Sequence, residues 1–151
     1  MRALLLVAVA LVATASHAAA PYTPPTPENL EALYSTTQNV VTVTWDAPSQ
    51  NGLTYLVWRD GQYLGSTSGT SFLDALPTSH DAGYIYFVSA QWVGNSGTYV
   101  SPPAVDGVST IACEVVSVST SWNYPYVYAH LHEECLGGTI TYDKDATWMS
   151  P

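Results

Sequence analysis

Short alternating runs, rather than helical repeats, fill most of this 151-residue chain. Between about residues 28 and 108, runs in which apolar and polar residues alternate are separated by turn residues. In the run 40–45, VVTVTW, the apolar side chains of Val41, Val43 and Trp45 fall on one face. Because strand side chains alternate between two faces, this period predicts half-buried strands. The sequence therefore predicts an all-β fold.

Turn residues place the boundaries of several of these strands. The segment 53–65, LTYLVWRDGQYLG, predicts two strands joined at Asp60-Gly61, a dipeptide that suits the positive φ angles of a tight hairpin. The run 83–92, GYIYFVSAQW, predicts another strand. Two adjacent prolines in the run 98–105 are tolerated only by an edge strand or a strand break.

Several segments occur in the order and spacing of one known family. They are PENLEA (27–32), Trp45 followed by DAP, the stretch 55–74, Leu76, YIYFVSA (84–90) and SPPAV (101–105). Together they make residues 28–109 resemble a fibronectin type III domain of the bacterial extracellular kind. The resemblance implies an immunoglobulin-like Greek-key β-sandwich whose core holds Trp45, Tyr55, Val57, Tyr84, Val88 and Ala90, with Leu76 and Tyr84 at its tyrosine corner. The family carries no chemistry of its own, so the resemblance implies a spacer, an adhesion surface or an accessory module.

Residues 1–18 have the layout of a secretory signal peptide, with Arg2 before an apolar run and small residues near its end. Cleavage is expected after Ala18, or alternatively after Ala20. The apolar run is too short for a membrane span, so none is expected in the mature chain. We therefore expect a secreted, extracellular or cell-surface protein, with the periplasm as a further possibility. Residues 19–27 are predicted to form a stiff Pro-rich linker.

The charge of the mature chain narrows the range of partners. Without its leader the chain keeps two basic residues, Arg59 and Lys144, against twelve acidic ones, a net charge of −10. That sign argues against nucleic acid and against anionic membrane surfaces as partners. The candidates that are left are proteins and polysaccharides.

Four large apolar residues are expected on an outer face of the sandwich. If Tyr55 points into the core, then Leu56 and Trp58 point out of it, and Ile85 and Phe87 do the same on a strand that the family places alongside. A contiguous apolar patch of this kind marks a covered surface or a binding surface on a soluble protein.

Residues 110–151 are a candidate cover for that patch. They contain strand-like runs at 110–118, 124–132 and 138–142, and an expected disulfide between Cys113 and Cys135. The loop that this disulfide closes contributes about 3 kcal/mol by the chain-entropy estimate. So small a segment rarely holds a core alone. It can pack on its own domain, pack on a neighbouring subunit by strand addition, or stand free as a disulfide-linked hairpin.

The polar stretch AHLHEEC, residues 129–135, divides between two strand faces. Leu131 and Cys135 fall on the mainly apolar side. The opposite side continues a row of tyrosines, and its residues are Tyr124, Tyr126, Tyr128, His130, His132 and Glu134. With Trp122 nearby, the tyrosine row is a candidate recognition surface for a protein or a polysaccharide, because tyrosine is enriched at such surfaces. The plain alternative is a solvated strand face.

Metal binding and catalysis find little support in the sequence. His130, His132 and Glu134 are the only metal-ligand candidates, and the sequence has no second spaced histidine pair and no HExxH motif. A Gly-x-Ser-x-Gly elbow, a phosphate loop and a dinucleotide fingerprint are also absent from the sequence. We therefore expect no cofactor and no enzyme.

The leading hypothesis is a secreted, non-catalytic binding or assembly protein that mediates extracellular protein–protein contact. Self-association into a surface or filamentous assembly is included in it. One alternative is a carbohydrate-binding or enzyme-accessory module, and another is a metal-binding protein that uses His130 and His132.

Overall fold

The structure is a computed structural model that describes residues 22–77, 82–111 and 113–151. The signal peptide expected at 1–18 lies outside the described residues. The strands are β1 (Glu28–Ser35), β2 (Val40–Asp46), β3 (Thr54–Arg59), β4 (Gln62–Thr67), β5 (Ser71–Ala75), β6 (Gly83–Gly94), β7 (Gly97–Val100), β8 (Ala104–Ser109), β9 (Cys113–Asn123), β10 (Tyr126–Cys135) and β11 (Ile140–Met149). The described part of the chain contains no helix long and apolar enough to cross a membrane.

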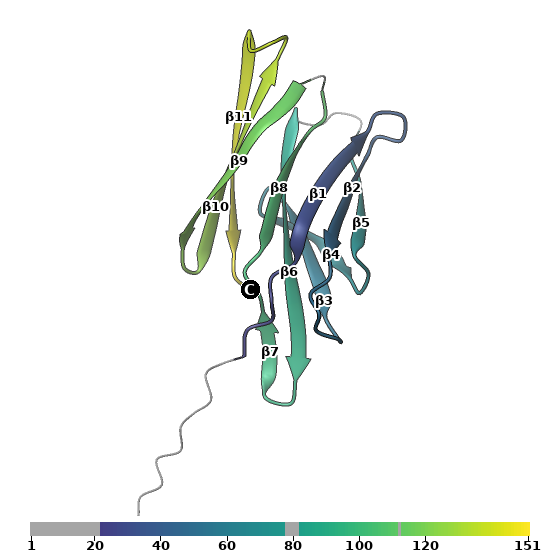
Figure 1. Cartoon of the computed structure of the whole chain (residues 1–151), viewed down its shortest axis with the longest axis vertical. Helices are drawn as coiled ribbons and strands as arrows, with labels where there is room; N and C mark the ends of the chain where they lie inside the picture. Colours follow the sequence, from purple (N-terminus) through teal and green to yellow (C-terminus); the bar gives the residue numbers. More distant parts are fainter. Residues whose placement is uncertain (1–21, 78–81, 112) are drawn as a thin grey trace, which may run out of the picture.

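The strands form three antiparallel sheets that stack in three layers (Figure 1). The first sheet has the order β1-β2-β5. The central sheet has the order β4-β3-β6-β7, and β8 also pairs with β6. The C-terminal sheet has the order β11-β10-β9 and lies on the far side of the central sheet. The predicted all-β fold is confirmed.

The first core lies between the first and central sheets. Val41, Val43 and Trp45 are buried on one face of β2, as their alternation predicts. The ring of Trp45 lies edge-on to that of Tyr55 on β3, with centroids 5.2 Å apart. All six residues that the family resemblance places in the core are buried: Trp45, Tyr55, Val57, Tyr84, Val88 and Ala90.

Two turn predictions are also confirmed. Asp60 and Gly61 join β3 to β4 with φ angles of 52° and 80°, the left-handed region that this dipeptide tolerates. The adjacent prolines 102 and 103 separate β7 from β8, and each of these strands pairs with a different part of β6. The strand is interrupted there because proline has no N–H group to donate to a neighbouring strand.

The N-terminal Pro-rich segment, which was predicted as a stiff linker, contacts the sandwich. Pro24 and Pro27 are buried, and the ring of Tyr22 lies edge-on to that of Trp92, with centroids 5.0 Å apart. From Tyr22 onward this segment packs on the sandwich. Proline composition sets the stiffness of a segment, whereas docking depends on the apolar surface that the segment meets.

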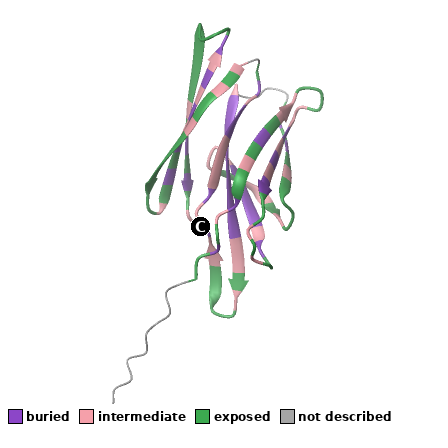
Figure 2. Ribbon diagram, in the orientation of Figure 1, coloured by how far each residue is buried: buried purple, intermediate pink, exposed green. Residues whose placement is uncertain are grey.

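The second core lies between the central and C-terminal sheets. Leu56, Trp58, Ile85 and Phe87 are buried there. The side chains that cover them come from β10 and β11: Val127, Ala129, Leu131, Ala146 and Trp148. Eight consecutive residues of β6, from Gly83 to Ala90, are therefore buried, and Figure 2 shows this strand in purple between the outer layers.

This packing corrects the predicted role of the four apolar residues. The prediction that these four residues form a binding surface for an outside partner is wrong, because residues 110–151 of the same chain cover them. Full burial of a side chain such as Ile85 or Phe87 contributes about 1.5–3 kcal/mol, which is the physical reason for the cover. Of the three arrangements that the sequence left open for residues 110–151, the structure has the one in which they pack on their own domain.

Glycines let the C-terminal sheet approach closely. A Cβ atom on Gly107 of β8 would lie 2.6 Å from Cδ1 of Leu131 and 2.9 Å from Cγ2 of Val118. A Cβ atom on Gly83 would lie 2.6 Å from Oε2 of Glu133. These distances are shorter than a carbon atom tolerates, so a larger residue at either position would force the facing side chains or the sheets to shift.

Candidate functional site

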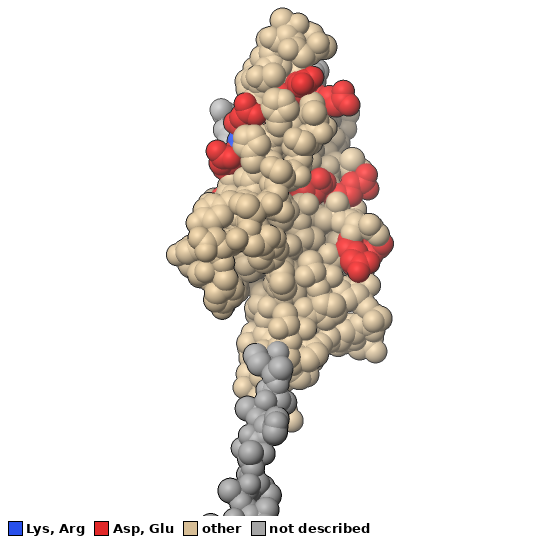
Figure 3. Space-filling view, turned by 60° about the vertical axis from the view of Figure 1, so that its left-hand side comes forward, with Lys and Arg blue, Asp and Glu red and all other residues tan. Residues whose placement is uncertain are grey.

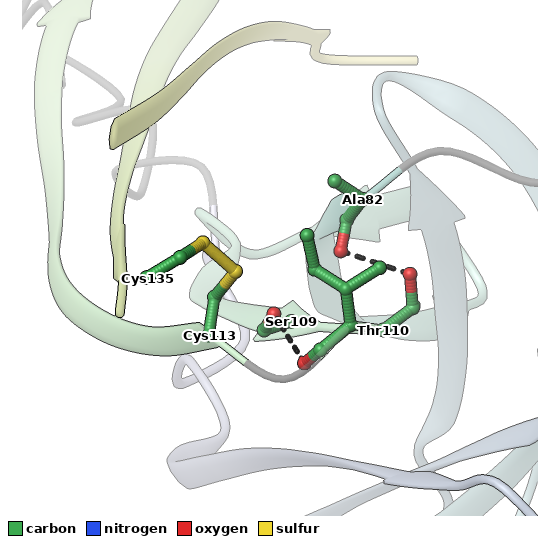
Figure 4. Close-up of a disulfide and its surroundings, with 6 residues drawn as sticks. Ala82, Ser109, Thr110, Cys113 and Cys135 are labelled. Atoms are coloured by element: carbon green, nitrogen blue, oxygen red, sulfur yellow. Dashed lines mark hydrogen bonds between the residues drawn. A yellow bond between two sulfur atoms is a disulfide. The ribbon is translucent and has the colours of Figure 1, made fainter. Parts of the chain in front are cut away.

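The disulfide fixes one end of the C-terminal sheet. Cys113 and Cys135 are bonded, as predicted, and they occupy directly opposed positions on β9 and β10 (Figure 4). Just before them, the backbone N–H and the hydroxyl of Thr110 both donate to the carbonyl oxygen of Ala82, at 2.7 and 2.8 Å. These hydrogen bonds therefore attach the C-terminal sheet to the sandwich just before its first strand, β9.

Strand register then decides which side chains share the exposed face of this sheet. His130 lies opposite Ser119 of β9 and Asp145 of β11. His132 lies opposite Ser117 and Asp143 in the same way. Because directly opposed residues of antiparallel strands point to the same side, each row crosses all three strands. The two faces predicted for residues 124–135 are confirmed in β10, which buries Leu131 and its alternate neighbours.

Two imidazole–carboxylate pairs lie on this face. Nδ1 of His130 lies 2.8 Å from Oδ1 of Asp145, and Nδ1 of His132 lies 2.6 Å from Oδ1 of Asp143. The hydrogen bond with Asp143 raises the pKa of His132, and the same bond lowers the pKa of Asp143. Neither aspartate was among the predicted site residues. Their spacing of two is the signal that places both on one face of a strand.

The predicted metal-ligand candidates lie close together, but the histidines form hydrogen bonds or ion pairs with carboxylates. His130, His132 and Glu134 share the exposed face of β10. Carboxylates of β11 engage the Nδ1 atoms of both histidines, and Nε2 of His132 lies 3.7 Å from Oε1 of Glu134. Within the described residues, no group of three or more His, Cys, Asp or Glu side chains is arranged to hold a metal ion.

A shallow groove of about 470 Å³ lies on this face of the sheet and includes the His130–Asp145 pair. Side chains from all three strands line it: Ser119, Ser121, Tyr128, His130, Asp145 and Thr147. It combines three hydroxyl groups, one phenol and one imidazole–carboxylate pair. These groups both donate and accept hydrogen bonds, so the groove suits a ligand that has many hydroxyl groups. We call it the polar groove.

A second cleft, of about 230 Å³, lies where the β9–β10 end of the sheet meets the connection between β7 and β8. Its lining includes Trp122, Tyr124, Tyr126, Trp148, Pro102 and Ser150. Trp122 and Tyr124 are 56% and 88% exposed, whereas Trp148 is 3% exposed. The indole nitrogen of Trp148 is buried and has no hydrogen-bond partner among the described residues. We call this the aromatic cleft.

The register corrects one detail of the predicted tyrosine surface. Trp122 and Trp148 both lie opposite Val127, so they share the inward side of the sheet. The tyrosine row points the other way, and Tyr126 and Tyr128 lie on the exposed face. Trp122 therefore lies on the same side of the sheet as Trp148, and not on the face that carries Tyr126 and Tyr128.

Glu133 is a buried carboxylate on the inward side of β10. Its side chain is 2% exposed, and its Oε1 has no hydrogen-bond partner among the described residues. Burial raises the pKa of Glu133, against the smaller effects of the Ser109 hydroxyl and the charge of Lys144. Lys144 itself forms an ion pair with Asp60, with 2.8 Å between Nζ and Oδ2. This lysine ties β11 to the β3–β4 turn.

Charge is unevenly distributed over the molecule. In Figure 3 the acidic side chains gather on the upper part and right-hand side of the face in view, and the lobe that projects at the lower left shows none.

No protein-family model matches the chain. No curated protein matches it either. Geometry and chemistry therefore carry the functional argument.

Proposed function

We propose that this chain is a secreted, non-catalytic binding or assembly protein built on a fibronectin type III domain. It mediates extracellular protein–protein contact, including contact with copies of itself. Two packed antiparallel sheets in which β3 and β6 are neighbours support the domain assignment. The disulfide supports export, because such bonds persist in oxidising compartments.

The observation that carries the proposal is the open edge of the C-terminal sheet. Strand β9 pairs with β10 on one side, and no described strand pairs with its other side. Residues 119–123 are exposed along their whole length, and Figure 2 shows the end of this strand in green. An edge of this kind presents unpaired N–H and C=O groups, which are a template for an added strand.

The two edges of this sheet differ in how they are protected. Natural sheets protect edges with charges, prolines, bulges or short strands. At its beginning β9 has the charge of Glu114 and an extra residue, Val116, at the shift in its register with β10. The stretch 117–123, SVSTSWN, has no charge and no proline. On the opposite edge, β11 carries three consecutive charged residues at 143–145.

A second copy of the chain is the occupant that this edge fits best. Pairing β9 with β9 in antiparallel fashion joins two three-stranded sheets into one continuous sheet. Because the mature chain has a net charge of −10, copies repel one another at their acidic surfaces. The neutral stretch of β9 is a place where two copies can approach without bringing negative charges close to one another. Symmetric pairing about Thr120 puts Ser119 of each copy opposite Ser121 of the other.

Light scattering coupled to size-exclusion chromatography tests this proposal over a wide range of protein concentration. The Ser119→Lys/Ser121→Lys variant places lysines opposite one another in the pairing, so its dissociation constant should rise at least about tenfold. The matched control, Thr141→Lys/Thr147→Lys, adds the same charge to exposed threonines of β11 and should associate like the unmodified chain. A chain that is monomeric at every concentration would overturn the self-association.

A further inference from the structure

The aromatic cleft has an uncharged lining. None of the residues that line it is Asp, Glu, Lys, Arg or His. A site for an anionic ligand needs cationic groups, and the mature chain as a whole repels anions. Metal cations need carboxylate or imidazole ligands, which this lining lacks. The chemistry of the lining therefore excludes anions and metal ions, and leaves a neutral ligand or an organic cation bound to the rings.

Exposed rings give the cleft its shape. Trp122 and Tyr124 keep most of their surface exposed to water. Flat rings exposed in this way bind ligands that also have a flat apolar face, since stacking removes both faces from water. The C–H face of a pyranose ring is such a surface, and its hydroxyl groups point away from the face.

Polar groups at the cleft complement those hydroxyl groups. The N–H of Trp148 has no hydrogen-bond partner within the described part of the chain, and the hydroxyl of Ser150 lines the same cleft. A buried donor without a partner is unfavourable, so a ligand hydroxyl that reaches it gains more than it would from a satisfied group. Exposed rings and a buried N–H without a partner thus belong to residues of the same cleft.

The aromatic cleft opens on the inward side of the C-terminal sheet and the polar groove on its exposed face, and the two approach each other at the β9–β10 end of the sheet. Tyr126 lines the cleft, and its ring lies 6.2 Å from that of Tyr128, which lines the groove. Beyond Tyr128 the track continues over Ser119, Ser121 and the His130–Asp145 pair. An extended ligand that passes round this end of the sheet meets aromatic rings first and hydroxyl groups afterwards.

From these observations we infer that the aromatic cleft and the polar groove form one binding site for a neutral oligosaccharide or polysaccharide. A sugar ring stacks on Trp122 and Tyr124, and the following units hydrogen-bond along the polar groove. A Pro-rich peptide also suits an aromatic cleft. A Pro-rich peptide has few groups that can hydrogen-bond to the hydroxyls and the imidazole–carboxylate pair of the groove. A glycan has many such groups, and this favours a glycan as the ligand. The site goes beyond the proposed protein contact at β9 and does not depend on it.

The experiment measures depletion of the soluble protein by insoluble cellulose, chitin and starch, with alginate gel as the anionic control. At least one neutral polysaccharide should bind the unmodified chain, and alginate should not. Trp122→Ala and Tyr124→Ala should each weaken that binding by about tenfold or more. The matched control is Tyr142→Ala, an exposed ring at the other end of the same sheet, which should leave binding unchanged.

Trp148→Phe separates a binding role of this residue from a structural one. The variant keeps an aromatic ring but removes the N–H group and part of the ring volume, so the thermal midpoint should fall less than in Trp148→Ala, and binding by the folded protein should weaken several-fold. Equal binding by this variant and the unmodified chain would contradict the role given to the N–H group.

Three results would overturn the inference. They are no binding to any of the three neutral polysaccharides, binding that Trp122→Ala and Tyr124→Ala leave unchanged, and binding of a synthetic PYTPPTP peptide at the cleft without binding of a glycan. A monomeric chain that binds a neutral polysaccharide would support the inference and overturn only the self-association at β9.

Discussion

The indole ring of Trp148 lies edge-on against that of Trp58, with ring centroids 5.6 Å apart and planes at 89°. Trp58 belongs to the central sheet and Trp148 to the last strand of the chain, so this contact joins residues that are far apart in sequence. Perpendicular aromatic pairs contribute about 0.5–1.5 kcal/mol beyond the area that they bury. The pair therefore stabilises the docking of the C-terminal sheet.

Replacing Trp148 by alanine should lower the free energy of unfolding by about 3–5 kcal/mol, because the substitution opens a cavity in the second core. Urea denaturation followed by circular dichroism measures the loss. Trp122→Ala is the matched control, since that indole is mostly exposed and its loss should change stability by about 0.5 kcal/mol or less. Similar losses in both variants would contradict the packing described for Trp148.

Gly107→Val should destabilise the fold by about 1–3 kcal/mol, because the added side chain meets Leu131 and Val118 at distances that force the sheets apart. Combining it with Leu131→Ala should restore part of the loss relative to the sum of the single changes. Gly69→Val places the same side chain at an exposed position with ordinary contacts and should be nearly neutral. Strict additivity of the two core changes would contradict the contact.

Glu133 should make stability fall as pH rises. Burial places its pKa in the folded chain above the unfolded value, so its contribution is present below the unfolded pKa and is lost as pH increases through the folded pKa. Glu133→Gln removes this titration. The stability of the variant relative to the unmodified chain should therefore increase between pH 4 and pH 8, as measured by denaturation at a series of pH values. Parallel curves for the two proteins would show that Glu133 is not desolvated.

The pKa of His132 should fall when Asp143 is replaced by asparagine. The hydrogen bond with that carboxylate is the largest cause of the raised pKa, and asparagine lacks the charge. NMR titration of the imidazole resonances measures the shift directly. Asp145→Asn provides the control, because Asp145 pairs with His130 and its loss should leave the titration of His132 nearly unchanged.

Alternation in the sequence predicted much of the fold, because it reports the face on which each residue lies. It separated Val41 and Val43 from their polar neighbours, and it placed Leu131 inward and His130 outward. The lengths of the last strands were underestimated. The polar end of β9 and the charged middle of β11 carry little apolar signal, and pairing with β10 keeps both extended.

The candidate site was less predictable, since it depends on register between strands distant in sequence. The tyrosines and histidines of β10 were found from one strand alone. The pairing of His132 with Asp143, and of Trp122 with Trp148 across Val127, required the alignment of three strands. No local pattern near Trp122 contains that information.

The burial of β6 on both faces affects where this protein can be divided. A boundary at Ser109, where the family resemblance ends, would leave Ile85 and Phe87 in water on an uncovered sheet. A fragment cut there would be prone to aggregate, and the remaining three strands would lose the surface on which they fold. The sequence resemblance covers residues 28–109, but the packed core extends to Trp148.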